Sequence, residues 1–124
     1  MRIDEILADV DEIKPNTYDD NVKLRWLSEL DGKIFDQIIL THEHEVPEEG
    51  ELTFEPYQSL SEDLLVPFPY TDLYRHYLFA MIDYSNGETD RYQNSMVMFN
   101  ASYQEFTNWY NRTHKPISKP LKIF

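Results

Sequence analysis

Apolar residues recur along this chain at intervals of three and four, the spacing that places them on one face of a helix. The pattern predicts four helices, over residues 2–13, 18–42, 71–85 and 88–113. Pro15 ends the first of them, because the residue before a proline is pushed out of helical geometry. Gly32 interrupts the second and predicts either a kink or the close approach of another segment. The predicted fold class is therefore all-α, with a single helical domain over residues 1–113.

The last two predicted helices form an antiparallel hairpin. Their apolar residues follow spacings of four and three: Leu73, Tyr77, Ala80 and Tyr84 in the first, and Tyr92, Met96, Phe99, Tyr103, Phe106 and Tyr110 in the second. Asn86-Gly87 is a suitable left-handed cap between them, and a connection this short brings two helices side by side. We expect the two apolar seams to face each other.

Residues 43–66 have no helical period and form a connector of unusual length for a compact domain. Such long loops are often functional. Two short runs within it, residues 52–54 and 64–66, alternate or are apolar enough to form a short β-hairpin.

Residues 114–124 form an extended basic tail, since Pro116 and Pro120 prevent a helix and favour an extended backbone. We expect the tail to bind a partner chain, although a frayed terminus or a strap over its own core remains open. Trp109 lies off the apolar seam, so it is either an interface anchor or a residue covered by the connector. The predicted partner-binding residues are Trp109, Arg112, Lys115, Lys119, Leu121, Lys122, Ile123 and Phe124.

The net charge of −12 is unevenly distributed along the sequence. Residues 1–64 hold 18 acidic and 5 basic residues, a net of −13, whereas residues 65–124 hold 5 acidic and 6 basic residues, a net of +1. Acidity on this scale argues against specific DNA binding, because the phosphate backbone is repelled. It would allow an acidic body and a basic tail to join copies head to tail, or it simply keeps the protein soluble.

Candidate catalytic and metal-binding chemistry is sparse. Cysteine is absent, and three glycines cannot build a phosphate-binding loop. His42 and His44 are two residues apart, so on a helix they point in different directions; on a strand they could converge, but the sequence shows no third ligand to complete a metal site. His42 is expected instead at a solvated helix end. The sequence therefore predicts no cofactor, no metal and no enzyme, with a metal-dependent enzyme using these two histidines as the least favoured alternative.

The order of several short motifs resembles the head–tail connector (adaptor) proteins of tailed phages and prophages of Gram-positive bacteria. The resemblance spans about residues 3–114, and the segments that carry it are Lys23-Leu24-Arg25-Trp26-Leu27, Leu64-Leu65-Val66-Pro67-Phe68-Pro69-Tyr70, Asp83-Tyr84-Ser85-Asn86-Gly87-Glu88, Arg91-Tyr92-Gln93-Asn94-Ser95 and Trp109-Tyr110-Asn111-Arg112. It implies a structural protein that assembles as a ring beneath the portal, with DNA passing through the centre. It also implies a location in the bacterial cytoplasm and then in the virion.

The alternative function is an acidic regulatory binding module, such as a DNA mimic. A mimic needs carboxylates spaced like phosphates on a smooth exposed face, whereas many of the acidic residues fall in the connector. Both candidate functions depend on protein–protein contacts and not on catalysis.

Overall fold

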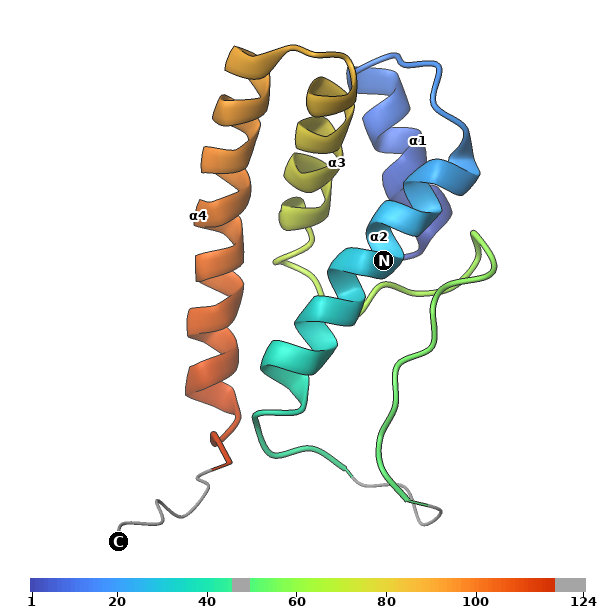
Figure 1. Cartoon of the computed structure of the whole chain (residues 1–124). Helices are drawn as coiled ribbons and strands as arrows, with labels where there is room; N and C mark the ends of the chain where they lie inside the picture. Colours follow the sequence, from blue (N-terminus) through green and yellow to red (C-terminus); the bar gives the residue numbers. More distant parts are fainter. Residues whose placement is uncertain (46–49, 118–124) are drawn as a thin grey trace, which may run out of the picture.

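The computed structural model describes residues 1–45 and 50–117. It contains four α-helices and one short π-helical segment: α1 (Ile3–Ile13), α2 (Asp20–Ile34), η1 (Phe35–Ile39), α3 (Asp72–Ser85) and α4 (Thr89–Thr113) (Figure 1). The described residues form no strand and hold only two isolated β-bridges. The all-α prediction is confirmed. None of the described helices has both the length and the apolar character that crossing a membrane requires.

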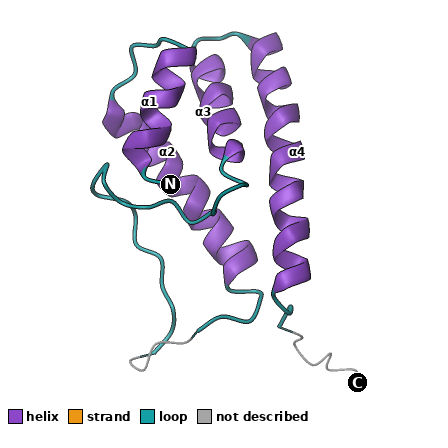
Figure 2. Cartoon of the chain, turned by 180° about the vertical axis from the view of Figure 1, so that it is seen from behind, coloured by secondary structure: helices purple, strands orange, loops and turns teal. Residues whose placement is uncertain are grey.

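Helix α3 lies in the middle of the molecule, with α4 on one side and α1 and α2 on the other (Figures 1 and 2). Helices α3 and α4 form the predicted antiparallel hairpin. Gly87 in their connection has a φ of +76°, the left-handed conformation that glycine adopts most easily. The Gly87 N–H donates to the carbonyl of Tyr84 at 3.1 Å, which closes the turn.

The apolar seam of α4 faces the core as predicted. Phe99, Phe106 and Tyr110 are buried, and the other seam residues are partly buried. The seam assigned to α3 is wrong in part, because Tyr84 is 66% exposed and Tyr77 is only partly buried. Since α3 has neighbours on both sides, it buries residues on several faces: Leu73, Tyr74, Leu78, Ala80, Ile82 and Asp83.

The predicted second helix divides into α2 and η1. The Leu40 N–H donates to the Phe35 carbonyl at 3.0 Å, five residues back, which is the bond that defines a π-helical turn. Gly32 marks the approach of another segment, since a Cβ at this position would lie 3.7 Å from the ring of Phe54. The connector therefore packs against the middle of this helix.

The predicted β-hairpin within the connector does not form in the described residues. Its second run instead follows the start of the chain, where the Ile3 N–H donates to the Glu62 carbonyl at 3.0 Å and the Leu64 N–H donates to the Met1 carbonyl at 2.9 Å. The first N–H groups of a helix have no partner within the helix. The connector satisfies them at α1, so it pairs with the N-terminus rather than with itself.

Candidate interaction surfaces

Asp31 is a fully buried carboxylate on α2 that anchors the connector. It accepts hydrogen bonds from the hydroxyl of Tyr74 at 2.6 Å, from the hydroxyl of Tyr57 and from the Leu65 N–H at 3.1 Å. Burial raises the pKa of Asp31 above its usual value, and the three hydrogen bonds oppose that shift. Burial and the neighbouring carboxylate also raise the pKa values of Tyr57 and Tyr74. The three donors belong to the loop that follows η1 and to α3, so the Asp31 carboxylate holds these segments to α2. We therefore assign Asp31 to the core of the fold.

The other buried charges are also partnered. Asp83 on α3 pairs with Lys14 and accepts a hydrogen bond from Ser95 on α4 at 3.2 Å. Lys23 is almost completely buried and pairs with Asp11 at 2.6 Å. Partnering lowers the cost of burying a charge, and these pairs join neighbouring helices.

His42 is buried rather than solvated, which corrects the sequence prediction. One ring nitrogen, Nδ1, lies 2.7 Å from the Ile38 carbonyl, and the other, Nε2, lies 2.6 Å from Oδ1 of Asn111 on α4. The ring also meets Tyr110 edge to face at 4.9 Å. His42 thus fastens the end of η1 to the end of α4. The described residues contain no group of three or more potential ligands that could hold a metal ion.

The first part of the basic tail pairs with the residues that follow η1. The Glu43 N–H donates to the Lys115 carbonyl and the Ile117 N–H donates to the Thr41 carbonyl, both at 2.8 Å. Arg112 and Lys115 are exposed, and their assignment to partner binding stays a prediction. The other predicted tail residues lie outside the described part of the chain: Lys119, Leu121, Lys122, Ile123 and Phe124.

Trp109 is partly buried, because the ring of Tyr70 lies 5.2 Å from it and that of His114 lies 6.1 Å from it. The covering residue Tyr70 follows the 43–66 connector and does not belong to it. Trp109 is therefore shielded on one side and presents only part of its surface.

The outer face of α4 exposes apolar side chains that the sequence analysis did not identify. Val97 is 66% exposed and Met98 is 51% exposed, although they lie in the middle of a helix of 25 residues. This helix holds only four charged residues, the acidic Asp90 and Glu105 and the basic Arg91 and Arg112. The outer side of α4 therefore carries two exposed apolar side chains near its middle and is balanced in charge, unlike the chain as a whole.

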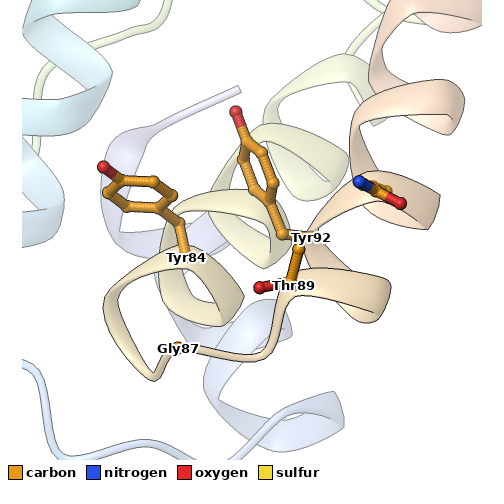
Figure 3. Close-up of a pocket in the computed structure, with 5 residues that line it drawn as sticks. Tyr84, Gly87, Thr89 and Tyr92 are labelled. Atoms are coloured by element: carbon orange, nitrogen blue, oxygen red, sulfur yellow. The ribbon is translucent and has the colours of Figure 1, made fainter.

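Several hollows border α4 in the described part of the chain. At the α3–α4 turn, Tyr84 and Tyr92 lie with their ring centres 5.3 Å apart and line an open notch of about 340 Å³ together with Gly87, Thr89 and Gln93 (Figure 3). A second hollow of about 320 Å³ lies between α2–η1 and α4. We call it the α2–α4 groove. Its lining residues are Leu30, Lys33, Gln37, Tyr77, Met96, Phe99, Asn100 and Tyr103.

Comparison with family models, curated proteins and solved structures found no match to this chain. The functional assignment therefore depends on the surfaces described above and on the motifs of the sequence.

Proposed function

We propose that this chain is a structural assembly protein that acts by protein–protein contacts, as a connector (adaptor) subunit at the head–tail junction of a tailed phage. The observation that carries the proposal is the exposed apolar face of α4, with Val97 and Met98 at its centre. Helix α4 packs mainly against α3, so its outer side is available to another chain. Exposed methionine and branched aliphatic side chains in the middle of a long helix are typical of an interaction surface.

A second copy of this chain is the occupant that the charge distribution favours. Two copies of a chain with a net charge of −12 repel each other over most of their surfaces. The two acidic and two basic residues of α4 cancel, so contact through this helix meets the least repulsion. Interface centres are also poor in charged residues, as this face is.

The resemblance to phage connector proteins is the basis for placing this chain at the head–tail junction of a phage particle. It favours a ring of copies beneath the portal, with neck proteins as further partners, and a closed ring requires the same contact to repeat around its axis. An acidic ring fits a channel for DNA, because a negative wall repels the phosphate backbone and does not bind it specifically.

The DNA-mimic alternative receives less support. Three carboxylates of α1 are held in ion pairs: Asp4 with Arg2, Asp9 with Arg75 and Asp11 with Lys23. Carboxylates neutralised in this way do not present the regular row of negative charges that a mimic needs.

Self-association of the purified chain tests the proposal. Light scattering coupled to size exclusion, across a concentration series, is expected to show a mass that rises with concentration. Met98→Glu should abolish the rise, because it places a charge at the centre of the contact. The matched control is Asn21→Glu, which adds the same charge at an exposed position of α2 and should leave the rise unchanged. A chain that stays monomeric throughout, or equal effects of the two variants, would refute the proposal.

A further inference from the structure

The proposed ring needs two different surfaces on each chain. A contact that pairs one patch with the same patch of a second copy is closed by a twofold axis, so it ends at a dimer. A ring instead joins a patch on one copy to a different patch on the next copy. The outer side of α4, with Val97 and Met98, is one of these surfaces in the proposed function. The second surface must be complementary to it and must lie elsewhere on the same chain.

The α2–α4 groove has the form that receives a helix. Its lining comes from α2 and η1, from α4 and, at Tyr77, from α3. It extends along α4 from Met96 to Tyr103, seven residues or about 10 Å of helix. A helix that binds between two others lays a ridge of its side chains into the groove between them. The notch at the α3–α4 turn is lined by a turn and two helix ends, so it offers less length for such a ridge.

The lining of the groove suits apolar side chains, methionine above all. Leu30 and Phe99 belong to its apolar surface, and the rings of Tyr77 and Tyr103 lie 5.3 Å and 5.6 Å from that of Phe99. A methionine sulfur makes favourable contacts with aromatic rings, and its flexible side chain fills irregular hollows. The groove therefore matches the chemistry of Met98 on a second copy.

The groove and the outer side of α4 also match in charge. Of the described residues, those that line the groove include one charged side chain, Lys33, and no carboxylate. Residues 92–104, the middle of α4, hold no charged residue. Two other hollows include Asp36 or Glu51 in their lining, so they fit a second copy with a net charge of −12 less well. Contact between the groove and α4 thus avoids most of the repulsion between two copies.

The two surfaces lie on nearly opposite sides of α4, so one chain can use both at once. At about 100° per residue, the α4 residues that line the groove centre close to Met96, and Val97 and Met98 centre about 160° away from them. Figures 1 and 2 show α1, α2 and α3 together on one side of α4, and Val97 and Met98 are exposed. A copy that binds in the groove therefore leaves the outer side of α4 available to the next copy.

We propose that the outer side of α4 of one copy binds in the α2–α4 groove of the next copy, with Val97 and Met98 on its aromatic lining. This inference rests on the proposed function, because it assigns the second surface of the contact through which copies associate. The contact joins two different patches, so it repeats from copy to copy as a ring requires.

Mixing two variants tests this contact. Met98→Glu damages the outer side of α4 and leaves the groove intact. Lys33→Glu combined with Gln37→Glu damages the groove and leaves α4 unchanged, since both exposed positions lie on α2 and η1. The matched control combines Asn21→Glu with Arg25→Glu, which makes the same change in charge at exposed positions of α2 with the same spacing. Circular dichroism checks that each variant keeps its helices.

The Met98 variant and the groove variant should each stay monomeric in light scattering, at concentrations where the wild type and the control associate. Their equimolar mixture should form a dimer of twice the chain mass of 14.9 kDa and nothing larger, because each pair has one intact outer side and one intact groove that can meet. A mixture that stays monomeric would overturn the inference. Equal loss of association in the control would also overturn it, since added charge alone would then be responsible.

The same series separates this inference from the proposed function. A groove variant that associates like the wild type, beside a monomeric Met98→Glu, would overturn the inference and leave the proposed function standing. Association of Met98→Glu on its own would overturn both.

Disulfide formation gives an independent measurement, because the chain has no native cysteine. Met98→Cys and Gln37→Cys are mixed as separate chains in a glutathione redox buffer. They should link to each other about tenfold faster than Met98→Cys chains link among themselves, because the contact raises the local thiol concentration. Equal or faster linkage among Met98→Cys chains would mean that copies pair through the same patch, and would overturn the inference.

Discussion

Replacing Asp31 should be the most disruptive change of a single polar side chain in this protein. In Asp31→Ala the hydroxyl of Tyr74 and the Leu65 N–H both lose their acceptor, and Tyr57 loses a third bond at a position where water can replace it. Each buried donor left without a partner costs about 1–3 kcal/mol. Adding the small cavity, we expect the free energy of unfolding to fall by about 3–5 kcal/mol.

Asp31→Asn should cost less and should reveal the titration of the carboxyl. The amide keeps the shape but turns a donor toward the Leu65 N–H, which costs about 1–3 kcal/mol. Because burial raises the pKa of Asp31, its protonated form stabilises the fold most below the unfolded value of about 3.9. That contribution is lost as the pH rises through the higher folded pKa. The stability difference between wild type and Asp31→Asn should therefore be largest in acid and shrink toward neutral pH.

Urea denaturation followed by circular dichroism at several pH values measures both effects. Asp36→Ala is the control, since it removes an exposed carboxylate from the same helical run and should change stability by less than about 0.5 kcal/mol. A loss below about 1 kcal/mol for Asp31→Ala would refute the role assigned to the network. A stability difference that grows with pH would refute the direction of the titration.

Three further substitutions follow from the packing. Phe99→Ala should cost about 3–5 kcal/mol in urea denaturation, because Phe99 is only 8% exposed and its ring lies against those of Tyr77 and Tyr103; an unchanged midpoint would mean that the seam faces solvent. His42→Ala should cost about 2–3 kcal/mol and speed hydrogen exchange of the Ile117 amide, and unchanged exchange would separate the histidine from the tail. Gly87→Ala should lower stability by about 1 kcal/mol, since its φ is +76°, and no loss would mean that the turn relaxes.

The sequence predicts α4 better than α3, and the reason is the number of neighbours. Helix α4 packs mainly against one helix, so its buried residues keep a regular spacing that can be read along the chain. Helix α3 is central and buries several faces, so the spacing that included Tyr84 selected a residue that is 66% exposed. The spacing of apolar residues identifies the buried face of a helix only where the helix buries a single face.

The buried polar groups and the hollows could not be predicted, because their members lie far apart in sequence. His42 meets Asn111, 69 residues away, and Asp31 meets Tyr74, 43 residues away. Nothing local to His42 distinguishes a buried histidine from a solvated one. The tail residues were recognisable because their charge and prolines are local, whereas the α2–α4 groove draws its lining from three segments.

The dependence of self-association on salt separates the two ways in which copies could meet. Contact through the charge-balanced face of α4 is opposed by repulsion between two chains that each carry a net charge of −12. Raising the ionic strength from 0.1 M to 1 M shortens the screening length from about 10 Å to about 3 Å, which removes much of that repulsion. The mass measured by light scattering should therefore rise with salt at constant protein concentration. Contact between the basic tail of one copy and the acidic body of another would show the opposite trend, because the same screening weakens attraction between opposite charges. A mass that falls as salt is added would therefore mean that copies meet through the tail and not through α4.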